Sequence, residues 1–150
     1  TKNRPLPLKT IKPAQALQFG IVLTIIGIAI LYIQINILTA FLSLLTTFLY
    51  IMVYTPMKRT SWLNTTFGAI PGAMPPLGGW AAATGHLNFD AGILFLILFI
   101  WQHPHFYSIA WMYKEDYKDG GFQMLPVVEP DGKRMFKHIM FYSYILIFLL

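Results

Sequence analysis

Long apolar segments alternate with short polar segments along the chain, and this alternation predicts a series of membrane-crossing helices. A helix needs about 20 apolar residues to cross a hydrocarbon layer about 30 Å thick. The pattern predicts spans at about 14–34, 37–54, 62–83 and 91–112, and a shorter one at 138–150. No strand-like alternation interrupts these segments, so we expect an all-α membrane protein, a polytopic bundle of transmembrane helices.

The third span, 62–83, differs from the others because it is rich in glycine and proline. Pro71, Pro75 and Pro76 lie within it, and Gly68 and Gly72 are four residues apart. Small residues at that spacing let neighbouring helices approach closely. We therefore expect this helix to pack inside the bundle and to line its cavity. Before it, Pro56 is expected to break the second helix, since proline lacks the N–H that a helix interior needs.

Composition supports a membrane location. Hydrophobic residues make up 56% of the 150 residues and charged residues only 11%, and the mean hydropathy is +0.57. The chain contains no cysteine, which excludes thiolate metal sites and disulfides. It starts at Thr1 and stops within an apolar run, so we expect it to be an interior fragment of a longer protein, within a single transmembrane domain.

The positive charges test this topology. All eleven lysine and arginine residues fall in segments 1–13, 58–59 and 114–137, which the predicted spans place on one membrane face. By the positive-inside rule, that face is the cytoplasm or the mitochondrial matrix. We therefore expect an integral protein of a bacterial inner membrane or a mitochondrial inner membrane. The net charge of +5 is then explained by the membrane topology, and we expect no nucleic-acid partner.

Acidic residues gather after the fourth span, where Glu115, Asp116 and Asp119 follow one another closely. The topology puts them on the same face as Lys58 and Arg59. Carboxylates bind Mg²⁺ through oxygen, and the ion keeps substrate phosphate oxygens as further ligands. This combination suits the binding of a magnesium diphosphate. Spacing alone leaves a second interpretation open, a solvated loop whose mixed charges balance one another.

Two histidines, His103 and His105, flank Pro104 near the end of the fourth span. Residues two apart on a helix point in nearly opposite directions, so we do not expect one metal ion to bind both. Each histidine is either hydrogen-bonded inside the bundle or functional, because an ionisable side chain at membrane depth is a candidate for function.

Three stretches in order along the chain resemble one protein family. They are TKNRPLP, YTPMKRTSWLNTTFGAIPGAMPPLGGWAAATG and WQHPHFYSIAWMYKEDYKDGGFQMLPVV. Together they resemble the haem O synthase (protohaem IX farnesyltransferase) branch of the UbiA-type intramembrane prenyltransferases, over nearly the whole chain. The resemblance implies a nine-helix bundle whose central cavity is capped by two acidic loops that hold Mg²⁺ and a diphosphate. The first acidic motif of the family would lie just before Thr1.

The resemblance also implies roles for individual residues. Lys58 and Arg59 match the basic pair of the family and, with Asp116 of KEDYKDGG, are the expected catalytic residues. Asp116, Asp119 and Glu115 are the expected metal ligands, although Asp119 departs from the spacing of four found in many relatives. Substrate binding is expected of Lys2, Arg4, Asn64, His105 and Lys114.

The implied reaction transfers the farnesyl group of farnesyl diphosphate to a vinyl group of haem B, and water adds to give haem O for terminal oxidases. Haem A synthase is the implied downstream partner. Three alternatives stay open. The same fold could prenylate another aromatic or tetrapyrrole acceptor, the glycine- and proline-rich span suits a transporter, and His103 or His105 suits an axial ligand of a membrane cytochrome.

Overall fold

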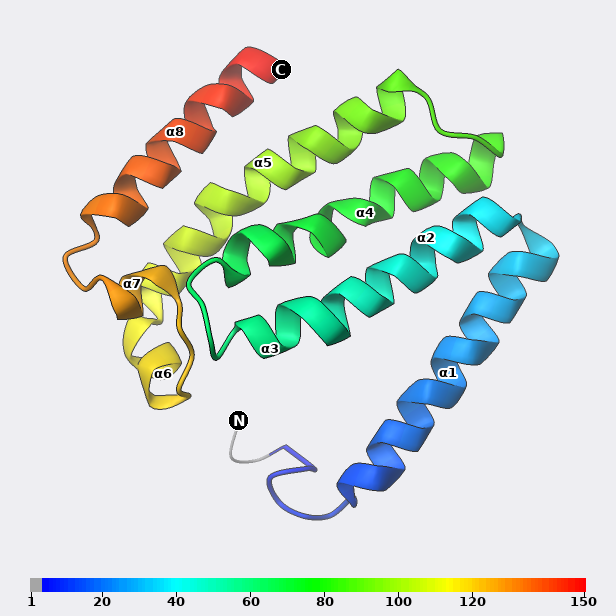
Figure 1. Cartoon of the computed structure of the whole chain (residues 1–150), viewed down its shortest axis with the longest axis horizontal. Coiled ribbons are helices and arrows are strands. Elements are labelled where there is room, and N and C mark those ends of the chain that lie inside the picture. The colour runs from blue at the N-terminus through cyan, green and yellow to red at the C-terminus, as the bar shows by residue number, and fades with distance from the viewer. Residues whose placement is uncertain (1–3) are drawn as a thin grey trace.

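The computed structural model describes residues 4–150, and Figure 1 shows its helices in chain order. The long helices are α1 (Pro13–Gln34), α2 (Ile37–Phe48), α4 (Asn64–Thr84), α5 (Phe89–Met112) and α8 (Lys133–Leu149). The π-helical segment η1 (Leu49–Tyr54) and α3 (Thr55–Met57) extend α2, and the short helices α6 (Lys114–Asp119) and α7 (Leu125–Val128) separate α5 from α8. Residues 4–150 contain no strand, which confirms the predicted all-α class.

The long helices lie side by side, and each packs on its neighbour in the chain. α1 contacts α2, α2 contacts α4, α4 contacts α5, and α5 contacts α8 (Figure 1). The connections between α1, α2, α4 and α5 are short, so these helices alternate in direction, and α8 turns back along α5 after the longer segment 113–132 (Figure 1). The turns at 35–36 and 85–88 therefore lie at one end of the layer, whereas the segments 58–63 and 113–132 lie at the other.

Three helical stretches are long and apolar enough to cross a membrane: Pro13–Gln34, Ile37–Met57 and Phe89–Met112. Large apolar side chains are exposed along them, and α1 buries none of its residues within the described chain. Such surfaces are stable against lipid or other apolar helices and not against water. The chain is an integral membrane protein.

The glycine- and proline-rich helix α4 lies in the middle of the layer (Figure 1). A Cβ atom at Gly68 would lie 2.5 Å from the ring of Tyr54, and one at Gly72 would overlap the side chain of Gln102. These two glycines therefore let η1 and α5 approach α4 more closely than any other residue would permit, which confirms the predicted interior position of this helix.

The second helix continues through Pro56 to Met57, so the prediction that this proline breaks the helix is wrong. In the preceding π-helical segment, the N–H of Thr55 bonds the carbonyl of Tyr50, five residues back, and the Thr55 hydroxyl donates to the same oxygen at 2.8 Å. Proline has no backbone N–H, so an ordinary α-helix would lack one hydrogen bond at Pro56. The wider π-helical turn shifts the hydrogen-bond pattern just before this residue. The last helix likewise begins at Lys133, ahead of the expected start near 138.

Asparagine side chains begin the helices α2 and α5 at the end of the layer that holds the turns 35–36 and 85–88. Asn36 accepts the backbone N–H of Thr39 at 2.8 Å and donates to the carbonyl of Ala81 at 2.7 Å, which ties α2 to the end of α4. Asn88 accepts the N–H of Ala91 at 3.1 Å at the start of α5. These bonds satisfy amides that the first turn of a helix leaves unpaired.

Candidate active-site cavity

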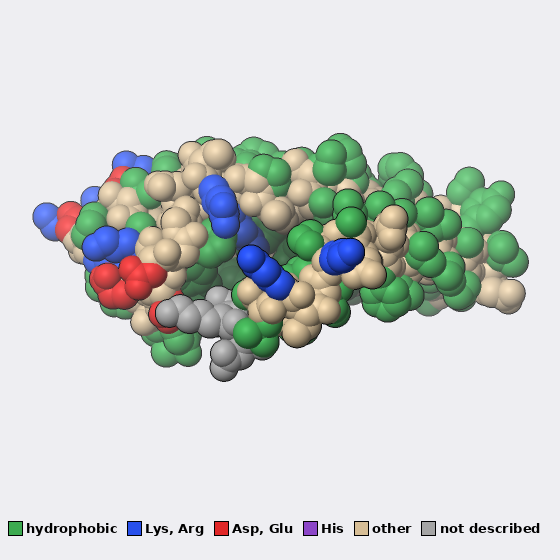
Figure 2. Space-filling model, turned by 90° about the horizontal axis from the view of Figure 1, so that it is seen from below, with side chains coloured by type: hydrophobic (Ala, Val, Ile, Leu, Met, Phe, Trp, Pro, Cys, Tyr) green, Lys and Arg blue, Asp and Glu red, His purple; other side chains and the backbone are tan. Residues whose placement is uncertain are grey.

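Charged side chains gather at one end of the helix layer. Seen from below in Figure 2, lysine and arginine side chains surround a hollow with apolar walls, and acidic side chains lie beside them. Among the described charged residues, Asp90 alone lies at the opposite end, in the first turn of α5. Arg4 is exposed in the segment before α1, and Lys2 lies outside the described residues. The charged end is therefore where a polar ligand can meet the bundle.

A cavity of about 210 Å³ opens at this end between η1, α4, α5 and α6. Five of its eleven lining residues are aromatic, and Lys58 is its only charged side chain among the described residues. The lining residues are Tyr50, Tyr54, Lys58, Thr65, Gly68, Gly72, Gln102, Phe106, Tyr117, Phe122 and Met124. A second hollow, of about 280 Å³ between α1, α2 and α4, has only hydroxyl groups as polar side chains and no charged side chain among the described residues that could bind an anion.

Lys58 stands at the mouth of the cavity over two aromatic rings. Its ammonium nitrogen lies 4.3 Å from the centre of the Tyr54 ring and 5.7 Å from that of Tyr50. Burial lowers the pKa of the Lys58 ammonium, because a partly dry environment penalises its charge. A cation held in this way gains strongly from an anion that enters the cavity.

Arg59 follows Lys58 but lies on the outer side of the mouth. Its side chain is exposed, and its guanidinium carbon lies 5.9 Å from the centre of the Phe122 ring. Since Phe122 lines the cavity, the guanidinium borders the same opening from outside. The two predicted catalytic cations therefore flank one entrance.

Asn64 is fully buried and joins two segments that are far apart in the sequence. Its side-chain amide donates to the carbonyl of Ser61 at 2.7 Å and to that of Gln123 at 3.0 Å. The N–H of Gln123 donates in turn to the carbonyl of Lys58 at 2.8 Å. The segment after α6 is thus fastened to the turn that carries Lys58, and the amide oxygen of Asn64 is left buried without a partner.

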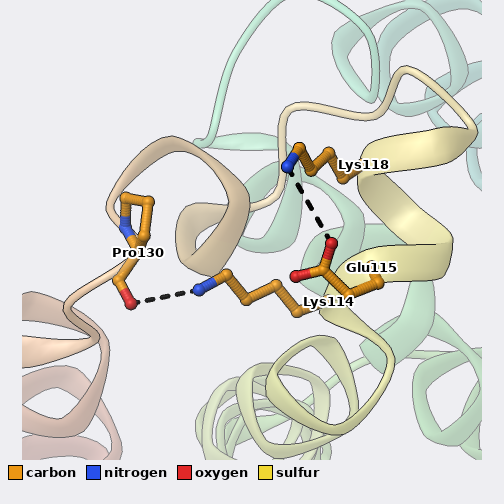
Figure 3. A network of polar contacts seen from close by, with 4 residues as sticks. All are labelled: Lys114, Glu115, Lys118 and Pro130. Carbon is orange, nitrogen blue, oxygen red and sulfur yellow. Dashed lines mark hydrogen bonds and ion pairs between the residues drawn. The ribbon is translucent and has the colours of Figure 1, made fainter.

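The acidic residues lie on α6, a separate short helix, because the backbone leaves the α conformation at Tyr113. Lys114 donates to the carbonyl of Pro130 at 3.1 Å, and Glu115 pairs with Lys118 at 3.9 Å (Figure 3). Glu115 and Lys118 are both well exposed, so this pair contributes little to stability. Tyr117 reaches from the same helix to the cavity, with its ring 6.0 Å from that of Phe122.

The carboxylates of α6 are suitable donors for Mg²⁺ only if other ligands complete the site. Asp116 and Asp119 are exposed, and neither forms an ion pair with a residue between Arg4 and Leu150. Within that range no three histidine, aspartate or glutamate side chains come together to hold a metal ion. Mg²⁺ is commonly bound by one or two carboxylates, with phosphate and water oxygens as its remaining ligands. The donor set of α6 fits that arrangement.

The two histidines of α5 point to different surroundings, as predicted. His103 is fully buried, and its Nδ1 lies 2.8 Å from the carbonyl of Phe99. A carbonyl only accepts, so Nδ1 carries the proton and Nε2 accepts from the hydroxyl of Thr66 at 3.3 Å. His105 is exposed and stacks on Trp101 with ring centres 4.6 Å apart. Neither histidine lines the cavity beneath Lys58.

Comparison with known proteins identifies the family of this chain. The model of the UbiA prenyltransferase family matches residues 1–150. The chain belongs to the UbiA prenyltransferase family.

Curated relatives in this family bear the name protoheme IX farnesyltransferase. The relative from Solibacter usitatus is 52% identical over 147 residues, which cover 98% of this chain and 50% of the relative. That from Salinibacter ruber is 54% identical over 132 residues, 88% of this chain and 47% of the relative. The human mitochondrial relative is 47% identical over 130 residues, 87% of this chain and 29% of the relative. The chain spans about half the length of the bacterial relatives, and no solved structure matches it.

Several cavity residues of this UbiA chain were not among the candidates from sequence. Tyr54 and Tyr117 lie within the motifs that supplied Lys58 and Asp116, yet aromatic residues are common in membrane helices and gave no distinct signal. Gln102 lies beside His103, and a carboxamide inside an apolar span is itself unusual. Polarity at membrane depth could therefore have indicated Gln102 from the sequence.

Proposed function

We propose that this chain forms part of a protohaem IX farnesyltransferase, which transfers the farnesyl group of farnesyl diphosphate to a vinyl group of haem B to make haem O. The observation that carries the proposal is the partly buried ammonium of Lys58 at the mouth of an aromatic cavity, in a chain of the UbiA prenyltransferase family. The substrates are inferred from the names of relatives that are about twice as long.

Lys58 and Arg59 act on the leaving group in this proposal. As the carbon–oxygen bond of the prenyl diphosphate breaks, negative charge grows on the diphosphate. A cation already held in place stabilises that charge without having to reorganise. Lys58 is held by the rings of Tyr50 and Tyr54, and Arg59 borders the same entrance beside Phe122.

The aromatic walls protect the cationic fragment that remains. Tyr54, Phe106 and Phe122 surround the cavity below Lys58. Their ring faces attract positive charge and keep bulk water from the reacting carbon. At about 210 Å³ the cavity is smaller than the roughly 300–1,000 Å³ of most small-molecule sites, so it accommodates the reacting end of a long substrate.

Mg²⁺ is the proposed cofactor, with Asp116 as its principal ligand and Asp119 and Glu115 as further donors. When bound, the ion would neutralise the diphosphate and hold its oxygens at the charged end. Lys2, Arg4 and Lys114 are the proposed additional cations for substrate binding there. Asn64 is proposed to support substrate binding by holding the segment after α6 in place, and His105 to contact haem B on the outer side of α5.

The charged end faces the cytoplasm of a bacterial inner membrane, or the matrix side of a mitochondrial inner membrane, in this proposal. The lysine and arginine residues gather there, and such residues favour the side from which a helix inserts. Farnesyl diphosphate is charged and would reach the cavity from that side, whereas haem B and the farnesyl chain are apolar enough to lie within the bilayer. Haem A synthase is the proposed consumer of the product.

The test uses membranes that contain the full-length protein, supplied with haem B and farnesyl diphosphate in either Mg²⁺ or EDTA. We expect a Mg²⁺-dependent product with the mass of haem B plus a farnesyl group and a hydroxyl group. If a different aromatic acceptor is prenylated and haem B stays unchanged, the prenyltransferase activity is supported but haem B is refuted as its acceptor. Absence of any prenylated product would refute the proposed activity.

A further inference from the structure

Gln102 brings an uncharged polar side chain to the inner end of the aromatic cavity. It is 5% exposed, and Gly72 on α4 leaves the space that its carboxamide occupies. No side-chain hydrogen bond joins this carboxamide to another residue in the described part of the chain. The carboxamide faces the cavity, where it can bind a water molecule or a ligand, because a polar group without a partner in an apolar wall is costly.

Gln102 and Lys58 mark opposite ends of the cavity. Thr65, in the first turn of α4, lies beside the turn that carries Lys58, whereas Gly72 lies about two helical turns, or about 10 Å, further along the helix. A diphosphate bound at Lys58 therefore leaves its reacting carbon between the aromatic walls, with the carboxamide of Gln102 beyond it.

We propose that Gln102 holds a water molecule at the inner end of this cavity, and that this water supplies the hydroxyl oxygen of the prenylated product. The inference rests on the proposed function. After prenylation, an aromatic acceptor restores its aromaticity by losing a proton. A vinyl acceptor is instead left as a carbocation that a nucleophile can capture. A held water is needed only for the second kind of acceptor.

The step balances without any further reactant. The vinyl π electrons form a carbon–carbon bond to the first farnesyl carbon as its bond to diphosphate breaks, and diphosphate leaves with the electron pair. The vinyl carbon next to the porphyrin becomes cationic and accepts a lone pair from the water. The proton released from that water leaves to solvent, so the products are the alcohol, diphosphate and a proton. Without a positioned water, the cation instead loses a proton from the neighbouring carbon and an alkene results.

A carboxamide suits this task in an apolar cavity. Its oxygen accepts one hydrogen of the water and leaves a lone pair free to face the cation, and its nitrogen can donate to a second oxygen. It carries no net charge, so it adds no ionised group at membrane depth and does not compete with Lys58 for the diphosphate.

The test replaces Gln102 by methionine, which has a similar length and lacks the carboxamide, in the full-length protein. A second variant, Gln102→Leu, guards against poor folding of the first. The matched control is Gln34→Met, an exposed glutamine at the far end of α1. Membranes receive haem B, farnesyl diphosphate and Mg²⁺ in ¹⁸O-labelled water, and mass spectrometry separates the labelled alcohol from the alkene, which is lighter by one water.

We expect the ratio of alkene to alcohol to rise about tenfold in the Gln102 variants and to stay unchanged in the control. An unchanged ratio in a correctly inserted variant overturns the inference, as does loss of both products, which would assign Gln102 an earlier role. If the unmodified protein forms no farnesylated haem at all, the proposed function fails first, so the two failures are distinguishable.

Discussion

The ammonium nitrogen of Lys58 lies 4.3 Å from the centre of the Tyr54 ring, and Gly68 leaves the space into which that ring packs. No salt bridge involves Lys58 within residues 4–150. The cation is therefore positioned by an aromatic surface and not by a carboxylate, which keeps its charge available to an incoming anion.

Removal of this charge should impair the reaction far more than it impairs folding. For Lys58→Gln we expect kcat/KM for farnesyl diphosphate to fall by about 10²–10³-fold, as when one preorganised group that stabilises a transition state is lost. The control is Lys133→Gln, an exposed lysine paired with Asp131 at 3.9 Å. Steady-state kinetics in membranes measure both, and equal effects of the two substitutions would contradict the role of Lys58.

The pH dependence should carry the signature of a buried ammonium. Burial lowers the pKa of Lys58, so the protonated form is lost at a lower pH than for an exposed lysine, and kcat/KM should fall earlier on the alkaline side. Bound diphosphate stabilises the protonated form of Lys58 and so raises its pKa. The alkaline fall in kcat should therefore occur at a higher pH than the fall in kcat/KM. In Lys58→Arg, whose guanidinium stays charged, any remaining activity should lack this alkaline fall. An identical profile in that variant would assign the titration to another group.

The substitution Gly68→Ala should displace the ring of Tyr54 and destabilise the protein. The added Cβ would lie 2.5 Å from the ring, and relief of such a clash typically costs about 1–3 kcal/mol. Gly79→Ala, on the same helix with nothing within 4 Å of its added Cβ, is the matched control and should be neutral or slightly stabilising. Thermal unfolding in detergent tests the difference. Equal melting temperatures for the two variants would show that the η1–α4 contact yields easily.

Asn64→Asp should loosen the segment that follows α6. The substitution keeps the shape but replaces the amide that donates to the carbonyls of Ser61 and Gln123 with a group that only accepts. We expect a stability loss of about 1–3 kcal/mol and faster proteolysis within 113–132. Protection by farnesyl diphosphate should be weaker than in the unmodified protein. Unchanged proteolysis would mean that Asn64 does not hold this segment.

Asp116→Asn tests the proposed metal ligand. We expect turnover to fall by at least about 100-fold and the remaining activity to need more Mg²⁺, because an amide is a weaker ligand than a carboxylate. Asp131→Asn is the control, since Asp131 is exposed and paired with Lys133. Activity titrated with Mg²⁺ separates the two, and an unchanged Mg²⁺ requirement in Asp116→Asn would refute its role as a ligand.

The positions of the helices could be predicted from the sequence because each span is a local property of length and apolarity. The opposite directions of His103 and His105 also followed from helix geometry alone. The continuation of the second helix through Pro56 could not be predicted, since it depends on a π-helical turn whose hydrogen bonds shift register before the proline.

The sequence by itself determined the all-α membrane class, the end of the molecule at which charge collects, and the basic pair Lys58 and Arg59, since all three depend on order along the chain. Only the tertiary structure decided that Tyr54, Gln102 and Tyr117 share one cavity with Lys58, and that Asn64 fastens to Gln123, 59 residues away. The reason is physical. The helical period shows which residues share a face, but the packing of side chains against glycines on a neighbouring helix decides which faces meet.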